Sequence, residues 1–175
     1  MKSKRWGRGW GREDCDYSVS CQNLFAGQIK FPRFFSPELK GVLICTTGEI
    51  SFYVDGKRIN SRSSSCGKRN IIIPKRTRVV TFRTRSTFPG IQRGVLASFG
   101  EGALVTDESW KCTNAVKTGW KAPDYSNQDW PSAVVFCNNT APISPMTHIR
   151  DIAGSAEWIW VGNQNATTIY CRRIL

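Results

Sequence analysis

The stretch that decides the fold runs from Asp107 to Trp160, where tryptophans, acidic residues and small residues recur at intervals. Its parts read Asp107-Glu-Ser-Trp-Lys-Cys112, Trp120, Asp129-Trp-Pro-Ser-Ala133 and Ala156-Glu-Trp-Ile-Trp160. Five of the seven tryptophans of the chain lie in this stretch. A tryptophan is so large that it serves either as a pillar of the core or as a binding surface. The placement of these five therefore bears on both the fold and the function.

Short runs rich in β-branched and aromatic residues surround this stretch and are separated by turn residues. Ile50–Val54 is followed by Asp55-Gly56, a strong hairpin-turn signal, and then by Lys57–Ile59. No segment keeps a helical period over three turns, so we expect at most single helical turns, near 128–130 and 149–153. The pattern predicts an all-β fold, an antiparallel β-sandwich of the jelly-roll type. The other expected strands are 41–46, 70–73, 78–82, 94–99, 133–136, 156–161 and 167–172.

Two interpretations follow for the tryptophans and their acidic neighbours. Strand alternation in 156–160 sends Trp158 and Trp160 to one face, which we expect to be the core. Asp107 and Asp129 are expected to accept hydrogen bonds from backbone amides and to hold turns, with the next tryptophan of each motif packed beneath. These residues are therefore interpreted as framework.

The 175 residues, 40% of them apolar, suffice for one domain with its own core. Residues 1–14 have no apolar period and contain Trp6-Gly-Arg-Gly-Trp-Gly-Arg12, so we expect a flexible Trp/Arg-rich arm, followed by a single domain over 15–175. The N-terminal segment lacks the apolar region of a signal peptide. The sequence contains no run of 18 apolar residues, so we expect no membrane span.

Seven cysteines are more than a reduced cytosolic domain usually carries, and their spacing does not suit zinc-ligand pairs. We therefore expect disulfides. The odd cysteine is either free or joins two chains into a homo-oligomer. The candidate pairs are Cys15 with Cys21, Cys45 with Cys66, and two of Cys112, Cys137 and Cys171.

Two glycosylation sequons agree with an oxidising environment. They are Asn138-Asn-Thr140 and Asn165-Ala-Thr167, and they make Asn138 and Asn165 candidate glycosylation sites. Together with the cysteines they indicate an extracellular, secreted protein whose signal peptide is absent from the given chain.

Several of these motifs together resemble those of the galactose-binding-domain-like jelly rolls. These are β-sandwich modules of lectins, also attached to glycosidases such as rhamnosidases and β-galactosidases. The resemblance covers about three quarters of the chain, from about Gly41 to the C-terminus. It implies a non-catalytic carbohydrate-binding module, although the basic stretch Lys57–Arg93 and the N-terminal arm depart from the family pattern. The residues that carry it are Tyr53-Val-Asp-Gly56, Asp107-Glu-Ser-Trp-Lys111, Gly119-Trp120, Tyr125–Ala133, Ala156–Trp160 and Tyr170–Arg172.

The parts of a common enzyme are not present in the sequence. There is one histidine, His148, and there is no Gly-x-Ser-x-Gly, Walker, His-Glu-x-x-His or Cys-x-x-Cys motif. A carboxylate pair for glycoside hydrolysis stays open, because thirteen acidic residues could supply one. We expect a non-enzyme without metal or cofactor, and interpret His148 as a surface or packing residue.

The excess of positive charge lies in the first half of the chain, residues 1–93. Lys57–Arg93 holds eleven basic residues and no acidic one, within a chain of net charge +12. Such a segment attracts polyanions. We therefore expect acidic or sulfated glycans, or other polyanions, as partners. Nucleic acid is less favoured, because no recognisable nucleic-acid motif is present.

The expected ligand-binding residues combine cations with loop aromatics. Guanidinium groups give bidentate contacts to sulfates and uronates, and a loop aromatic stacks on a sugar face. The alternative function is a disulfide-linked structural or adhesive protein of the extracellular matrix. The candidates are Arg76 and Arg78, expected on one strand face, Arg83 and Arg85 on the next, and Trp120 and Tyr125 in the loop 119–128.

Overall fold

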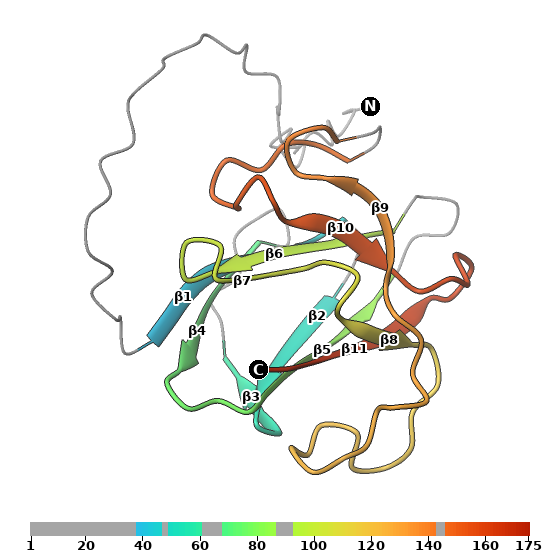
Figure 1. The fold of residues 1–175 in the computed structure, drawn as a ribbon. Helices are drawn as coiled ribbons and strands as arrows, with labels where there is room; N and C mark the ends of the chain where they lie inside the picture. The colour runs from blue at the N-terminus through green and yellow to red at the C-terminus, as the bar shows by residue number, and fades with distance from the viewer. Residues whose placement is uncertain (1–37, 47–48, 61–67, 87–92, 143–145) are drawn as a thin grey trace, which may run out of the picture. The chain divides into compact units, whose positions relative to one another are not determined.

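The computed structural model describes residues 38–46, 49–60, 68–86, 93–142 and 146–175. All of them belong to one compact unit, Pro32–Leu175. They form eleven strands in two antiparallel sheets that pack as a sandwich (Figure 1), which confirms the expected all-β fold. These described ranges contain no helix, and hence none able to cross a membrane. The expected arm, its boundary at residue 15, and Cys15, Cys21 and Cys66 lie outside them.

The first sheet, called sheet A, has its strands in the order β4-β1-β6-β10-β9, and β7 pairs with β6. Sheet B has the order β3-β2-β5-β11-β8. In sheet A the strands are β1 (Glu38–Cys45), β4 (Arg69–Pro74), β6 (Val95–Phe99), β7 (Leu104–Val105), β9 (Val134–Asn138) and β10 (Glu157–Trp160). In sheet B they are β2 (Glu49–Val54), β3 (Lys57–Ile59), β5 (Val79–Arg85), β8 (Lys111–Thr113) and β11 (Thr168–Ile174).

Every expected strand is present, and the hairpin turn is confirmed. Asp55 and Gly56 have φ angles of 46° and 80°, both positive, as a two-residue type I′ turn requires. The sequence did not reveal β7 and β8, which have two and three residues and are too short to display an alternation. The expected helical turns are single turns, in which Trp130 N donates to Asn127 O and Ile152 N to Ile149 O.

The main core lies between the two sheets. Alternate residues of β2 and β5 point into it, including Phe52 and Phe82. Trp110 and Trp160 are fully buried there, and the ring centroids of Phe82 and Trp110 are 5.3 Å apart. Burying a large apolar side chain contributes about 1.5–3 kcal/mol, so these aromatic residues stabilise the contact between the sheets.

A second apolar cluster covers the outer face of sheet A. Trp158 packs there with Met146, Ile149 and Ile152, on the far side of the sheet from Trp160. The expectation that Trp158 and Trp160 share a face is therefore wrong, although both are buried as expected. The pairing of β10 with β9 shifts between Trp158 and the next residue, and the extra residue lies in β9. Such a bulge bends the strand pair and increases its twist, so the regular alternation of faces does not continue across it.

A disulfide closes the end of sheet B. Cys112 of β8 and Cys171 of β11 are directly opposite in the pairing, with their Cα atoms 4.1 Å apart, and their side chains are fully buried. Cys112 N donates to Pro131 O at 2.9 Å, away from β11. This fits a cross-strand pair without mutual hydrogen bonds, where side chains approach most closely. The third expected pair is thus confirmed, with Cys137 as the cysteine left out of it.

Candidate functional site

The hairpin turn between β2 and β3 is fastened to the start of β5 by one side chain. One carboxylate oxygen of Asp55, Oδ1, accepts hydrogen bonds from Arg78 N at 3.0 Å and Val79 N at 2.9 Å. The backbone adds a third bond, from Asp55 N to Val79 O at 3.0 Å. The β2–β3 turn and the β4–β5 turn therefore form one structural unit.

The β4–β5 turn is itself tightly closed. Pro74 O accepts hydrogen bonds from Thr77 N at 3.3 Å and from Thr77 Oγ1 at 2.6 Å. Arg76 has φ 68°, in the left-handed region that is unusual outside turns. Arg76 and Arg78 therefore project from a turn, and the expectation that they share a strand face is wrong.

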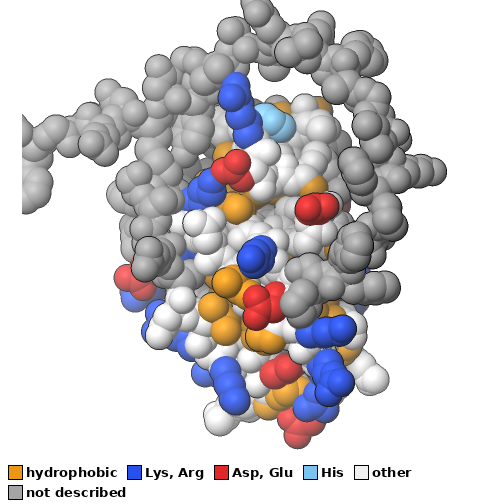
Figure 2. Space-filling view, turned by 90° about the vertical axis from the view of Figure 1, so that its left-hand side faces the viewer, with side chains coloured by type: hydrophobic (Ala, Val, Ile, Leu, Met, Phe, Trp, Pro, Cys, Tyr) orange, Lys and Arg blue, Asp and Glu red, His pale blue; other side chains and the backbone are white. Residues whose placement is uncertain are grey.

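Five exposed cations lie in the β4–β5 turn or at the start of β3, directly after the hairpin turn, and we call them the cationic end. In Figure 1 the two turns lie at the lower end of the sandwich, and Figure 2 shows Lys and Arg side chains gathered at that end with some acidic ones among them. Asp55 itself is half-buried. The members of the cationic end are Lys57, Arg58, Lys75, Arg76 and Arg78.

A sixth cation lies beside the cationic end. The Lys121 ammonium is 4.7 Å from the centre of the Tyr53 ring, and Tyr53 lies opposite Arg58 in the β2–β3 pair. A Cβ added to Gly56 would lie 3.4 Å from Lys121 O. The hairpin turn and the β8–β9 connection are therefore in contact, which adds Lys121 to the positive surface.

Arg83 and Arg85 lie elsewhere. Both are on the outer face of sheet B, because the residue between them, Thr84, is buried. Arg85 is opposite Glu49 on β2, so its charge faces an acidic neighbour. Residues 78 and 85 are separated by roughly 23 Å along an extended strand. The structure thus divides the four expected arginines into two groups and joins only Arg76 and Arg78 to the cationic end.

Trp120 and Tyr125, the expected aromatic contacts, belong to a loop that covers the outer face of sheet B. The Trp120 side chain is 8% exposed. Its ring lies 5.6 Å from that of Tyr53 and 5.0 Å from that of Tyr170, both edge-on. Tyr125 is half-buried, 5.9 Å from the ring of Trp130. The described geometry thus leaves no open indole face at Trp120 on which a sugar could stack.

Sequence reasoning missed the residue that holds this loop. Arg172 of β11 is fully buried. Its Nη1 donates to the carbonyls of Trp120 at 3.3 Å and Ala122 at 2.9 Å, and Nη2 donates to that of Pro123 at 3.0 Å. Burial lowers the pKa of Arg172, while Asp124 opposes the shift. A guanidinium remains protonated in proteins, so the loop closes over a buried positive charge.

The other polar residues that the sequence singled out either hold a turn or lie exposed at the surface. Asp107 Oδ1 accepts hydrogen bonds from Ser109 N at 2.9 Å and from the Ser109 hydroxyl, which confirms that it holds a turn. Asp129 is exposed, and the neighbouring turn is closed by the backbone instead. His148 is exposed, with Nδ1 2.7 Å from Asn139 O.

Acidic side chains are the remaining candidates for metal binding or acid–base chemistry. Within the described ranges, no three His, Cys, Asp or Glu side chains are placed to hold a metal ion. Burial raises the pKa of Glu157, and the charges of Asp107 and Glu108 raise it further. Glu157 is the first residue of β10. Of the three, Asp107 holds a turn through its side chain.

Comparisons with known proteins give no relative for this chain. No family model, no curated protein and no solved structure matches it.

Proposed function

We propose that this protein is an extracellular, non-catalytic module that binds acidic or sulfated glycans through the cationic end, on a sandwich of the galactose-binding-domain-like type. One observation carries the proposal: five exposed Lys and Arg side chains lie at or directly beside two turns that Asp55 fastens together. Fixed turns hold several positive charges in a constant arrangement. A regular anionic polymer can then contact them together.

The energetics favour a polymer over a small anion. A single exposed ion pair contributes only about 0.2–1 kcal/mol, so one sulfate on one cation would bind weakly. Contacts with several linked anionic groups add up, because the later contacts are intramolecular. Arginine adds bidentate hydrogen bonds to planar or tetrahedral anions. Binding by this surface is therefore expected to be multivalent and to weaken steeply with salt.

The aromatic residues near the cationic end favour a glycan over single-stranded nucleic acid. Proteins that bind single strands stack the bases on aromatic rings. Tyr53 is the half-buried ring beside Arg58, and it already has Lys121 over one face and Trp120 at 5.6 Å. The polymer contacts available there are therefore charge contacts, which sulfates and carboxylates satisfy.

The alternative function is a disulfide-linked matrix protein, in which an odd cysteine joins two chains. Cys112 and Cys171 are bonded within the chain and do not provide that link. A non-reducing gel separates the alternatives. A covalent dimer or polymer that disappears on reduction supports the matrix protein, and a monomer that still binds heparin supports the glycan-binding module.

The experiment that tests the proposal measures heparin affinity as a function of salt. The variant Arg76→Gln/Arg78→Gln removes two charges from the cationic end. By analogy with phosphate contacts, the slope of log affinity against log salt should fall by about 2. The variant should also elute from a heparin column at lower salt than the unchanged protein.

A matched control removes the same charge elsewhere. Lys117→Gln/Arg150→Gln also lowers the net charge by two, at exposed positions outside the cationic end. It should keep the salt slope. An equal loss of affinity in both double variants would show that only net charge matters, and an unchanged protein that does not bind heparin would refute the proposal.

A further inference from the structure

The two sequons have the same arrangement in the structure, although they lie in different connections. In each one the asparagine and the threonine are exposed, and the residue between them is buried. Asn139, between Asn138 and Thr140, is fully buried. Ala166, between Asn165 and Thr167, is 8% exposed. Each sequon is therefore fixed at its centre and open at both ends.

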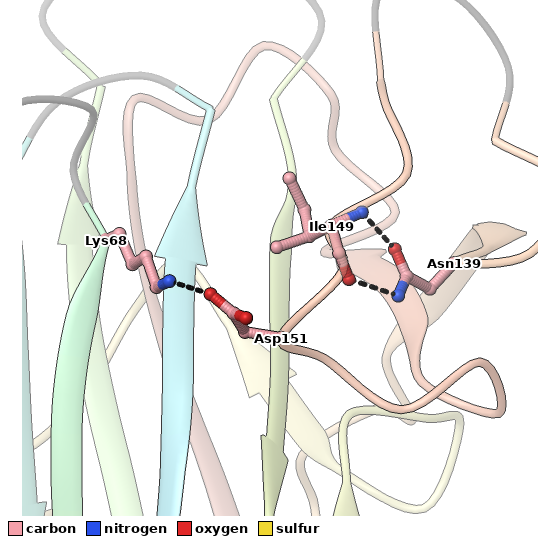
Figure 3. A network of polar contacts seen from close by, with 4 residues as sticks. All are labelled: Lys68, Asn139, Ile149 and Asp151. Atoms are coloured by element: carbon pink, nitrogen blue, oxygen red, sulfur yellow. Dashed lines mark hydrogen bonds and ion pairs between the residues drawn. The ribbon is translucent and has the colours of Figure 1, made fainter. Parts of the chain in front are cut away.

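The structure gives the adjacent asparagines 138 and 139 different roles. The Asn139 amide nitrogen donates to Ile149 O at 2.9 Å and to Ile152 O at 2.8 Å, and its oxygen accepts from Ile149 N at 2.8 Å. Figure 3 shows the pair of bonds with Ile149, beside the ion pair of Lys68 and Asp151 that also holds this segment. Asn139 is thus a structural residue.

Asn138 is held through its oxygen alone. Its Oδ1 accepts hydrogen bonds from Thr140 Oγ1 at 2.8 Å and Ala141 N at 2.7 Å, which closes a local turn. Among the described residues, no hydrogen bond involves the amide nitrogen of Asn138. That nitrogen is the atom to which an N-linked glycan attaches.

Asn165 lies in the turn between β10 and β11. Asn163 Oδ1 accepts a hydrogen bond from Asn165 N at 3.0 Å, and Asn163 O accepts one from Ala166 N at 3.1 Å. On the other side, Thr167 O accepts a hydrogen bond from Ser86 N at 2.7 Å. The backbone of the turn is therefore fixed, while the Asn165 side chain is exposed.

We propose that Asn138 and Asn165 are both N-glycosylated. The donor is an oligosaccharide linked through pyrophosphate to a lipid. The asparagine Nδ2 forms a bond to the first carbon of the sugar, the bond from that carbon to the pyrophosphate breaks, and the lipid pyrophosphate leaves. One amide proton is released. The inference rests on the extracellular location proposed above, because the donor is met in the secretory pathway.

Each glycan has a consequence that the structure specifies. Asn138 ends β9, an edge strand of sheet A on which Val134 is 37% exposed. A bulky hydrophilic group there protects the edge from pairing with another chain. The residue after the second sequon, Thr168, is opposite Arg85. A glycan on Asn165 therefore stands beside Arg83 and Arg85 and leaves the cationic end, at the other end of β5, open.

The test expresses the full chain behind a cleavable secretion signal in animal cells. Total cellular and secreted protein are treated with peptide-N-glycosidase in heavy-oxygen water, which marks each formerly glycosylated asparagine as labelled aspartate. Both Asn138 and Asn165 should be labelled. Asn138→Gln and Asn165→Gln should each remove one step in mass. Thr140→Ser and Thr167→Ser, which preserve the sequons, should keep both steps.

An unlabelled asparagine in chains that entered the secretory pathway overturns the proposal for that site. Because cellular protein is included, a variant that fails to leave the cell still reports its glycans. Heparin binding is measured separately on purified protein, so loss of the glycan inference leaves the proposed function standing, and the reverse also holds. Asn165→Gln should bind heparin as the unchanged protein does; a changed salt slope would contradict the placement of its glycan away from the cationic end.

Discussion

Substitution of Asp55 tests whether the cationic end depends on a fixed arrangement of its charges. Asp55→Asn keeps an oxygen that can accept the hydrogen bonds from Arg78 N and Val79 N. Asparagine also tolerates the left-handed backbone at φ 46°. Asp55→Gly tolerates the same backbone but has no side-chain acceptor. Both variants lose the same negative charge, so a difference between them reports the role of the hydrogen bonds.

The expected stability change follows from those two bonds. Hydrogen bonds to a charged group contribute about 1.5–3 kcal/mol each when both partners are protected from water. Arg78 is exposed, so its backbone N–H can form a hydrogen bond with water when the carboxylate is removed. We therefore expect Asp55→Gly to lose about 1–3 kcal/mol in total. That corresponds to a fall in Tm of roughly 2–12 °C. Asp55→Asn should stay within about 1 kcal/mol of the unchanged protein.

Heparin binding should become stronger in Asp55→Asn, because the variant loses a negative charge that repels the ligand. An anionic group about 8 Å from Asp55 is repelled by roughly 0.5 kcal/mol in water, a factor of about two in affinity. Asp55→Asn should therefore elute from heparin at higher salt than the unchanged protein. Asp55→Gly should elute earlier than Asp55→Asn, because its turns are no longer fastened together. The two measurements are the heparin elution profile and the thermal unfolding curve.

Two results would refute this reasoning. If Asp55→Gly binds heparin as tightly as Asp55→Asn, the hydrogen bonds do not position the cations. If neither variant differs from the unchanged protein in elution, the anionic ligand does not contact the region around Asp55.

Three further predictions concern the framework. Replacing Cys112 and Cys171 by alanine removes a link across 59 residues and should cost about 4 kcal/mol in denaturant unfolding by chain entropy; a loss below about 1 kcal/mol would contradict this. Arg172→Met removes the guanidinium donor from three carbonyls, of which only that of Ala122 keeps another bond within the described residues, from Tyr125 N, and should cost about 3 kcal/mol. Proteases should then cut within 114–130, and resistance there would argue against the role of Arg172. Glu157→Gln should raise Tm at pH 7 but not at pH 3. The folded state holds the Glu157 proton more tightly, so its contribution is full below the ordinary glutamate pKa and is lost as pH rises through the raised value; equal Tm values at pH 7 would contradict it.

Local sequence signals predicted those parts of the fold that local chemistry determines. The Asp55-Gly56 turn follows from backbone preference alone, and the expected strands follow from alternation. The faces of Trp158 and Trp160 could not be predicted in this way. A bulge between them depends on the pairing with β9, which a single strand does not display.

Part of the candidate site could likewise be predicted from local sequence signals. The excess of charge in Lys57–Arg93 located the positive region, but the hydrogen bonds that Asp55 accepts from Arg78 N and Val79 N decide which cations lie together. No feature of the sequence distinguishes Arg172 from its neighbour Arg173. Only the loop that folds over it makes it a buried residue, and the same loop buries Trp120. Contacts between residues distant in the sequence thus decide which cations lie together and which side chains the loop buries.

The most direct test of the central claim locates a bound glycan on the protein. Amide hydrogen exchange would be measured with and without a sulfated oligosaccharide at low salt. If the cationic end is the binding surface, residues 55–58 and 75–78 should be protected, while 83–85 and 163–167 exchange as before. Protection confined to 83–85, or to the loop 114–130, would contradict the account.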